Sequence, residues 1–491
     1  MTRRRTSRVH PAHAAVLALA AGAPTLAQSD PEAVQRLERQ LRETDQALRI
    51  SVPADQPISE RLLFDAGATL RFAYYFVDDS SPNRRELRQY EGRVYARAEL
   101  DGAHRFYARL KFQYDDFNPG DSFDGRGDDW NDPFLERAWY EFDLRGLERA
   151  RTGTASDHNL NIRAGKQFIH WGSGLTLSNT MFAGLLDLEF GSLGFSVLGG
   201  ITAPKDVIDF DGTRPGFDSS VNRTFVGAQL EHRGLASHRP YISFLAQIDQ
   251  ERNDFFDFGG LFPTRYGYDS QYLILGSKGS LAPNWTYRAE LVKEFGRTWS
   301  SPIDPLTLTP IAQTRDDIDA WAGLLGVTWL ARDSADTRVD LEFVGATGDD
   351  DRLSANDTFG GNSPNTTDRA FNSLGYVNTG LALAADPTNL LSFRAGVSTS
   401  PWKGSNGALD GLRLGLDGFI FLKADADAPI SVPTMMGDSF VGGELDLLVE
   451  WRLLSDVTAI LRYGVFFPGE AMPVGADDVR HFLYAGVTYA F

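Results

Sequence analysis

Alternation of apolar and polar residues over short segments is the feature that most constrains the fold of this chain. Segments rich in Tyr, Phe, Trp and Gly recur along the sequence, separated by polar stretches rich in Gly and Asp. Successive side chains of a β-strand point to opposite faces, so each segment has one apolar face and one face of small or polar residues. The last segment shows this plainly, because one of its faces carries Leu483, Ala485, Val487, Tyr489 and Phe491. The pattern predicts a sheet that is apolar on one side only.

Two all-β architectures contain strands of this kind, a soluble β-sandwich and a transmembrane barrel. The chain has 491 residues, whereas a single soluble core splits into domains beyond about 250 to 300 residues. No linker-like stretch divides the sequence, and a barrel can grow by adding strands around its perimeter. The sequence also lacks the run of about 18 uncharged apolar residues that indicates a transmembrane helix. We therefore predict an all-β fold, a transmembrane antiparallel up-and-down β-barrel.

Eighteen segments have the length and alternation expected of membrane-spanning strands. They lie near 64–77, 89–100, 104–115, 134–144, 159–169, 182–190, 193–201, 223–233, 240–250, 270–280, 285–296, 320–331, 337–347, 389–399, 410–423, 442–454, 457–467 and 481–491.

The connections between these segments alternate in length. Tight turns are expected at Asp101-Gly102, Pro283-Asn284 and Ser455-Asp456. Long connections fall between them, such as 116–133, 202–222, 251–269, 297–319 and 348–388. Barrels of this class have short turns on the periplasmic side and long loops outside. The alternation therefore predicts the topology, with both ends of the barrel in the periplasm.

The segment from Leu374 to Ala384 also alternates and could be counted as a nineteenth strand. A spanning strand there would place the short 385–388 link outside and the long 348–373 loop inside, which reverses the pattern of every connection upstream. We therefore expect 374–388 to belong to one long extracellular loop, with room for a short helix at Leu381 to Ala385.

The start of the chain has the features of a secretory signal peptide. A basic stretch precedes an apolar run from Ala14 to Ala23, and Thr25-Leu26-Ala27 fits a small-residue cleavage site. The basic residues are Arg3, Arg4, Arg5 and Arg8. We expect a signal peptide over 1–27, and the complete lack of cysteine suits an exported protein.

Residues 28–60 are expected to form an N-terminal periplasmic helix and linker ahead of a barrel at 61–491. Four apolar residues lie at heptad spacing, namely Val34, Leu37, Leu41 and Leu48. The helix is either a short oligomerising element or a frayed amphipathic lead-in to the barrel.

The charge of the chain limits its partners. The formal net charge is −18, and removal of a signal peptide that has four Arg and no acidic residue lowers it to −22. Nucleic acid is not an expected partner, because phosphate binding requires a basic surface. Much of the acid is concentrated in two loops: Asp115, Asp116, Asp121, Asp124, Asp128, Asp129 and Asp132 in one, and Asp349, Asp350 and Asp351 in the other.

No sequence motif indicates catalysis or a dedicated cofactor. The chain has no HExxH pattern and no Gly-x-Ser-x-Gly elbow, so we predict that it is not an enzyme. Carboxylates of the acidic loops could bind Ca²⁺, but no EF-hand spacing is present and solvated loop surface is the simpler interpretation.

Alternation also assigns one face of each strand to the lumen. In 104–114, Phe106 and Leu110 share one face, and Arg105, Arg109 and Lys111 share the other. A cation that faces lipid at the bilayer midplane costs about 2 to 4 kcal/mol, so the basic face must point inward. The same sorting predicts a contiguous basic wall on the first five strands, made of Arg71, Arg93, Arg97, Arg105, Arg109, Lys111, Arg137 and Arg163.

Acidic residues are expected on the strands just before the junction where the last strand meets the first. Glu444, Asp446 and Glu450 share the inward face of 442–454, and closure brings the last strands beside the first. Opposed charged walls create a transverse field across a water-filled pore, and rings of Arg favour anions. The alternative is that these inward charges only pair with one another in a narrow or plugged lumen.

Several motifs resemble those of the alginate export porin family. Arg163-Ala164-Gly165-Lys166-Gln167 resembles the family's Arg-x-Gly-Arg-Gln strand, although Lys166 stands where the family usually has Arg. The other matching stretches are His170-Trp171-Gly172, Gly345 to Asp351, Asp386 to Leu390, Gly443 to Leu447, Tyr463 to Gly469, and the closing Phe491. The resemblance implies a monomeric barrel of eighteen strands whose inward Arg residues pass an anionic polysaccharide. The possible N-terminal helix is, more weakly, similar to that of the trimeric phosphate-selective porins.

These observations favour an outer-membrane channel of a Gram-negative bacterium for anionic solutes or an anionic polysaccharide. The alternative function is a closed-lumen barrel whose extracellular loops serve adhesion or an enzymatic role. The expected partners are outer-membrane lipid and lipopolysaccharide, the transported anion, and the outer-membrane assembly machinery, which reads a C-terminal strand ending in Phe. A monomer is expected rather than a trimer.

A closed barrel should resist unfolding by SDS until it is heated, because every strand edge is paired. We predict that unheated protein migrates differently from boiled protein on SDS gels and fractionates with outer membranes. Recovery from the soluble periplasm, with a single gel mobility, would contradict the barrel.

Overall fold

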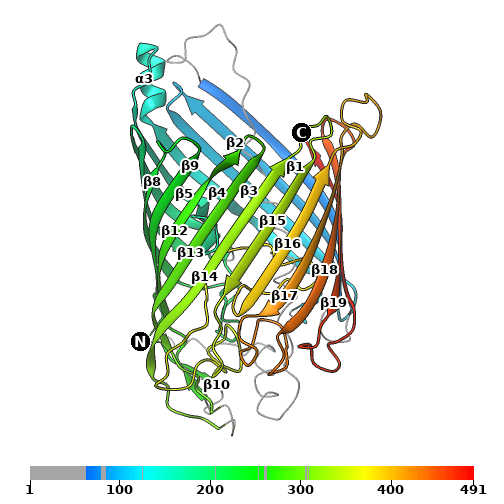
Figure 1. Cartoon of the computed structure of the whole chain (residues 1–491). Helices are drawn as coiled ribbons and strands as arrows, with labels where there is room; N and C mark the ends of the chain where they lie inside the picture. The colour runs from blue at the N-terminus through cyan, green and yellow to red at the C-terminus, as the bar shows by residue number, and fades with distance from the viewer. Residues whose placement is uncertain are drawn as a thin grey trace.

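A computed structural model describes residues 62–491 except 79–83, 124, 205, 253, 259–261, 305–306 and 308. The predicted signal peptide and N-terminal helix lie outside the described residues. The described part forms one closed antiparallel barrel of 18 strands (Figure 1). No described helix is long and apolar enough to cross a membrane.

All eighteen predicted strands are present. They are β1 (Leu62–Asp78), β2 (Arg84–Leu100), β3 (His104–Phe117), β4 (Asp129–Asp143), β5 (His158–Trp171), β6 (Leu177–Phe190), β7 (Leu193–Thr202), β8 (Arg223–His232), β9 (His238–Asp249), β12 (Tyr268–Ala282), β13 (Trp285–Trp299), β14 (Arg315–Leu330), β15 (Arg338–Ala346), β16 (Leu390–Thr399), β17 (Leu412–Lys423), β18 (Phe440–Arg452), β19 (Val457–Pro468) and β20 (Arg480–Ala490).

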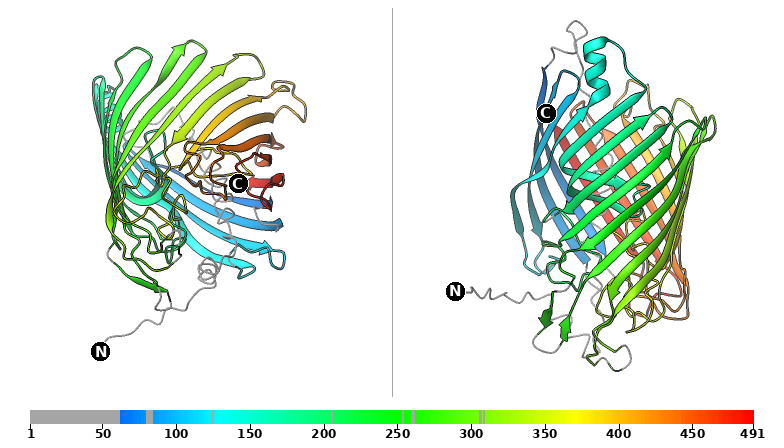
Figure 2. Two further views of the ribbon diagram at one scale, coloured as in Figure 1. Left: turned by 60° about the horizontal axis from the view of Figure 1, so that its bottom comes forward. Right: turned by 90° about the vertical axis from the view of Figure 1, so that its left-hand side faces the viewer.

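Closure comes from the pairing of the last strand with the first. β20 pairs antiparallel with β1 from Thr69↔Ala490 to Val77↔Phe482, while the other edge of β1 pairs with β2. Figure 2 shows the strands tilted around the barrel wall. A closed ring leaves its backbone hydrogen bonds satisfied by neighbouring strands, which is what hydrocarbon requires of a membrane-spanning sheet.

The chain has three smaller elements that the sequence did not indicate. Helix α3 (Leu144–Thr152) follows β4 and ends at Gly153, whose φ of 72° is left-handed. Strands β10 (Phe256–Phe258) and β11 (Phe262–Thr264) form a hairpin within the connection between β9 and β12.

The segment 374–384 is not a membrane-spanning strand, as predicted, but the short helix allowed at Leu381 to Ala385 was wrong. The chain forms a turn at 380–383 instead. Gly380 has a φ of 86° and Ala384 a φ of 48°, and left-handed residues at both positions prevent a right-handed helical turn.

Short and long connections gather at opposite ends of the barrel (Figure 1). The end with short connections, here called the turn end, includes Asp101 and Gly102, whose φ values of 50° and 72° suit a tight two-residue hairpin turn. It also holds α3. The opposite end, here called the loop end, holds the long connections, including the longest, 347–389.

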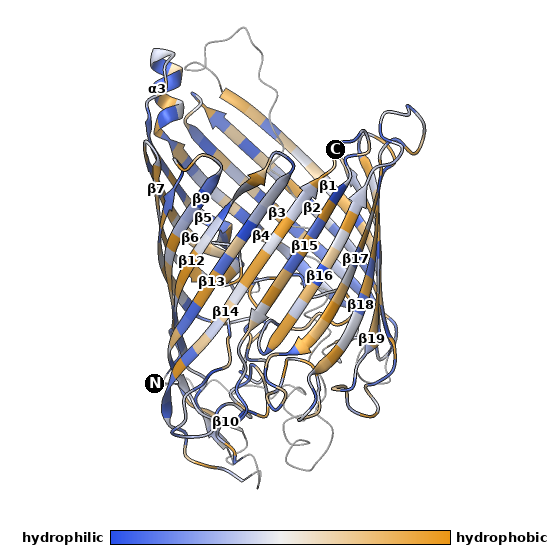
Figure 3. Ribbon diagram, viewed as in Figure 1, coloured by the Kyte–Doolittle hydropathy of each residue, from blue (hydrophilic) through white to orange (hydrophobic). Residues whose placement is uncertain are grey.

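Hydropathy alternates along the strands, as Figure 3 shows. Large apolar side chains such as Leu70, Phe72, Phe106 and Leu445 are exposed on the outer face. Their in-chain neighbours of opposite parity point inward. The outer face is therefore suited to lipid and the inner face to polar groups.

The lumen is not empty at the loop end. Inward residues of β6, β7, β12, β13, β14 and β15 form a buried apolar cluster with Phe371, Leu374 and Val377 of the longest loop. Part of that loop thus folds into the barrel and covers the wall there. Its Leu381 and Ala384 form a second buried cluster with Ala73 and Tyr75 of β1 and Leu87 of β2, so the loop also contacts this wall at the loop end.

The topology predicts which inserted tags antibodies can reach on intact cells. Val474, in the connection between β19 and β20, is 94% exposed at the loop end. Asn406 is exposed in the connection between β16 and β17 at the turn end. A tag at Val474 should be labelled on intact cells and a tag at Asn406 only after the outer membrane is permeabilised. The reverse result would invert the assigned orientation.

Candidate functional site

The inward face of β1, β2 and β3 carries a cluster of cations around Glu91. Arg71 Nη2 and Lys111 Nζ lie 2.9 and 3.1 Å from Glu91 Oε2, and Arg93 is also paired with this carboxylate. Arg71 is the cross-strand partner of Glu91, and Arg93 is that of Lys111. Glu91 itself is buried, so one carboxylate holds three cations in place.

A second buried carboxylate, Glu136, joins this cluster through an irregularity in β4. Arg93 Nε and Arg109 Nε lie 3.1 and 2.7 Å from Glu136 Oε2. Strict alternation would turn Glu136 to lipid with Ala138 and Tyr140. The β3–β4 register shifts between Arg109 and Leu110, and the resulting bulge points Glu136 inward. Alternation alone therefore did not predict that Glu136 faces the lumen. An acidic residue at a position that alternation turns to lipid was the signal that the alternation breaks there.

A second set of inward charges lies nearer the turn end. Arg97 Nε is 3.0 Å from Asp65 Oδ2, and Arg105 Nη1 is 2.5 Å from Glu141 Oε1. The guanidinium of Arg163 lies 3.9 Å from the other oxygen of Glu141. Arg163 also lies over the ring of Trp139, and Arg137 over the ring of Phe168. The eight predicted basic residues thus share one wall, with acids placed between them.

The exposure of these cations falls from the turn end toward the middle of the barrel. The exposed fraction of the side chain is 38% for Arg105 and 16% for Arg97, but only 7% for Arg109 and 5% for Lys111. The cations at the level of the Glu91 and Glu136 carboxylates, here called the constriction, are therefore more enclosed than those nearer the turn end, here called the vestibule.

Glu444 anchors the longest loop rather than facing open water. Its carboxylate accepts hydrogen bonds from the backbone N–H groups of Leu381, Ala382 and Leu383 at 2.5, 2.7 and 2.8 Å. Asp446, on the same face, is also buried, and Glu450 is half-buried. The acids predicted on β18 lie on one inward face, but the sequence did not indicate the anchoring role of Glu444.

The segment 372–383, here called the strap, is anchored at its other end to walls far from β18. Asn372 N donates to Glu294 Oε2 on β13 at 3.0 Å, and its carbonyl accepts from Tyr272 Oη on β12 at 2.6 Å. Ser178 N of β6 donates to the Leu374 carbonyl at 3.0 Å. Main-chain groups of the strap therefore find their partners on the barrel wall.

The strap crosses the lumen. The strap is hydrogen-bonded to β6 at Leu374 and to β18 at Leu381 to Leu383. β6 is ten strands from β18 in one direction around the ring and eight in the other, so the two strands lie almost opposite each other. Leu374 and Leu381 are separated by seven residues, which can span at most about 25 Å. A chain that short connects opposite walls only by passing through the interior.

The tip of the β5–β6 hairpin reaches into the lumen beside the strap. Ser173 donates from both N and Oγ to the Glu290 carboxylate of β13, at 2.7 and 2.6 Å. Tyr376 N of the strap donates to the Gly174 carbonyl at 2.8 Å. Glu290, Glu294 and Glu444 thus use the same device, a buried wall carboxylate that accepts N–H groups of an inward segment.

Two loops of the loop end are joined through buried carboxyls. Thr358 N and Oγ1 donate to Asp211 Oδ2 at 3.0 and 2.5 Å, and Gly212 N donates to Asp357 Oδ1 at 2.9 Å. Burial and the nearby Asp211 carboxyl raise the pKa of Asp357 to about 7. Burial also raises the pKa of Asp211.

A buried ion network holds the connection between β7 and β8 against the wall. Arg214 contacts Asp209 and Asp249 at 3.1 and 2.6 Å, and Arg223 contacts Asp209 at 2.8 Å. In the described part of the chain, no group of three or more His, Cys, Asp or Glu side chains is placed to hold a metal ion.

Comparison with known proteins agrees with this architecture. The sequence profile of the alginate export family ("Alginate export") matches residues 201–485. The crystal structure of OccK11 (OpdR) from Pseudomonas aeruginosa is similar, with a TM-score of 0.52 at 12% identity over 89% of this chain and 98% of that chain. OccK8 (OprE) from the same organism has a TM-score of 0.52 at 10% identity, over 87% and 98%. No curated protein matches the chain significantly.

Removal of the Glu444 anchor should release the strap. In Glu444→Ala, three N–H groups lose their acceptor, and each buried unsatisfied donor costs about 1 to 3 kcal/mol. We predict a larger single-channel conductance with more frequent open-state fluctuations. Glu450→Gln, on the same face of β18, is the control and should conduct like the wild type. Equal conductance in all three proteins would contradict a crossing strap.

The Asp211–Asp357 contact predicts pH-dependent docking of these two loops. A carboxyl whose pKa is raised in the docked state stabilises docking below its ordinary pKa, and this contribution is lost as the pH rises through about 7. Hydrogen exchange of 347–389, corrected for its intrinsic pH dependence, should therefore show weaker protection at pH 8 than at pH 5.5. Asp357→Asn, whose amide oxygen can still accept from Gly212 N but which carries no charge, should remove the difference; a difference that persists would assign it to other groups.

Proposed function

The chain belongs to the alginate export family, whose profile covers more than half of it, and from this premise we propose that it passes anionic solutes or an anionic polysaccharide along the basic wall of β1 to β5. It is an outer-membrane channel protein of a Gram-negative bacterium and not an enzyme. What remains to be tested is the charge of the permeant species and the part played by the basic wall.

The observation that carries the proposal is the charge balance of the constriction. Among the ion pairs described at this level, four cations are paired with two carboxylates, Glu91 and Glu136, so cations are in excess within this set. The four cations are Arg71, Arg93, Arg109 and Lys111. A narrow, poorly hydrated passage screens charge weakly, so an excess of cations favours entry of anions.

Ion pairing and anion transport are compatible in this arrangement. An Arg guanidinium has five donors in a planar fork, and one carboxylate does not use them all. The paired acid fixes the direction of the fork, and the rungs from Arg105 through Arg97 to Arg109 follow one another from the vestibule to the constriction. An anion with several carboxylates or phosphates can then exchange partners from one rung to the next.

The alternative function, a closed-lumen barrel, is favoured by one observation, the low exposure of the constriction. Glu91 and Glu136 have side chains that are only 1% exposed. If that closure is permanent, the extracellular loops would carry adhesion or an enzymatic role. The absence of any conductance from folded, inserted protein would support this alternative and exclude a channel.

We also propose the partners of the outer face and of the C-terminal strand. The apolar outer face should contact membrane lipid and lipopolysaccharide, and the C-terminal strand ending in Phe491 should be read by the outer-membrane assembly machinery. We propose that the barrel acts as a monomer, because its closed wall needs no second copy.

Removing either the cations or the acids of two ion pairs should shift the reversal potential in opposite directions. Arg97→Gln with Arg109→Gln removes two cations and should shift the reversal potential in a KCl gradient toward cation selectivity. Asp65→Asn with Glu136→Gln removes their partners and should shift it toward anions. Both shifts should shrink at high salt, because the Debye length falls from about 30 Å at 0.01 M to about 3 Å at 1 M. Unchanged reversal potentials in open, folded variants would overturn the proposed role of the wall.

A further inference from the structure

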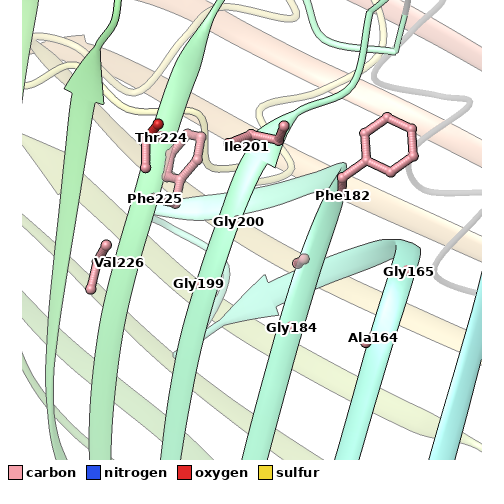
Figure 4. A pocket seen from close by; sticks show the side chains of 11 residues that line it. Ala164, Gly165, Phe182, Gly184, Gly199, Gly200, Ile201, Thr224, Phe225 and Val226 are labelled. Atoms are coloured by element: carbon pink, nitrogen blue, oxygen red, sulfur yellow. The ribbon is translucent and has the colours of Figure 1, made fainter.

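The barrel wall has an open seam at the loop end between β4 and β5. These strands pair only from Ala138↔Lys166 to Asp143↔Asn161. β4 begins nine residues earlier, at Asp129, and β5 continues to Trp171, where it pairs with β6 alone. The β5–β6 hairpin leaves the wall at this level and bends into the lumen (Figure 4).

The bend has a local cause at Gly165. Its φ is 136°, and a Cβ at this position would lie 2.2 Å from the Ala138 carbonyl oxygen. Only glycine accepts both this backbone conformation and this close approach. Beyond the bend, Trp171, Leu175 and Leu177 pack into the buried cluster inside the barrel.

The half of β4 nearest the loop end has residues typical of an unpaired edge strand. Pro133, which has no N–H to donate, lies in this part of the strand, and Asp129 and Asp132 are exposed there. Proline and charge are the usual protection of an unpaired strand edge. The seam is therefore built into the sequence of the strand.

Lys166 closes the seam from within. Its Nζ donates to the Leu135 carbonyl of β4 at 2.7 Å and is paired with Asp206. The same ammonium lies 5.5 Å from the ring centre of Phe134 and 5.8 Å from that of Phe182, one ring on each side of the seam. The cation thus satisfies an edge carbonyl of β4 and contacts aromatic rings on both sides of the gap.

On the outer face of β5 to β8, an apolar hollow of about 510 Å³ opens to the membrane. Gly184 and Gly199 face each other across β6 and β7, and a Cβ at either would meet nothing within 4 Å. Phe182, Ile201 and Val226 form its exposed rim (Figure 4). Behind it, Met181 and Phe225 are fully buried, so the hollow opens to the membrane and not to the lumen.

We propose that this hollow, which Gly165 lines at the bend of β5, binds one acyl chain of a lipid in the loop-end leaflet. A hydrocarbon chain fits because the hollow is almost wholly apolar and lies on the face that the barrel turns to lipid. A membrane lipid is the source because it reaches the hollow from the side, whereas the packed interior blocks access from the lumen.

Filling the hollow tests the site. Gly199→Leu places a side chain in the empty space, and Gly323→Leu, at an outward glycine of β14 where an added Cβ has only ordinary contacts, is the matched control. Each protein is purified in detergent, incubated with lipid A, the acylated part of lipopolysaccharide, or with free palmitate, and examined by native mass spectrometry. Heat-dependent gel mobility identifies the folded protein.

Wild type and Gly323→Leu should retain one lipid A molecule, and Gly199→Leu should retain it roughly tenfold less, since each methylene that loses its contact weakens binding several-fold. Retention of palmitate alone would assign the site to a free fatty acid and overturn the lipid assignment. Equal retention by the three proteins, or none by the wild type, would overturn the site itself. If Gly199→Leu does not fold, Ile201→Ala with Val226→Ala removes the rim and should also lower retention. Conductance should not change in any of these variants, so this test is independent of the proposed transport function.

Discussion

Backbone groups that face hydrocarbon must find their partners within the protein, and the rest of this structure depends on that constraint. Pairing of β20 with β1 closes the sheet and sends every inward side chain into one interior. On the membrane-spanning strands, polar and charged side chains are stable only in this interior, and there they need hydrogen-bond or ion-pair partners. The basic wall, its interleaved acids and the inward loops are consequences of this closure.

Buried carboxylates do two different jobs in the interior. Glu91 and Glu136 hold cations at the constriction, whereas Glu290, Glu294 and Glu444 accept backbone N–H groups of segments that enter the lumen. The first group fixes the positions of wall cations, and the second fixes the strap and the hairpin tip against the wall. The same residue type therefore tunes the passage on one side and fills the barrel on the other.

The sequence predicted the strands well because alternation and the need to face lipid act on every residue of a spanning segment. It failed where one residue changes the rule. A bulge reversed the direction of Glu136, and left-handed Gly380 and Ala384 excluded the helix expected beside them. The partners of Glu444 could not be predicted, since 381–383 is far from it in the chain and only the path of the strap brings them together. Gly165 and Pro133 were available signals of the seam, but their meaning depends on which strands are neighbours.

The central claim is that the passage follows the basic wall of β1 to β5 on the turn-end side of the longest loop, whereas that loop packs over the inward face of β12. The chain has no cysteine, so a single introduced thiol can report access from water. Thr69 is half-buried on the inward face of β1 opposite Arg93, and Ile274 is fully buried on the inward face of β12. A charged methanethiosulfonate reagent added to an open channel should reduce the current of Thr69→Cys and leave Ile274→Cys unchanged. Equal modification of both, or modification of Ile274→Cys alone, would contradict the account.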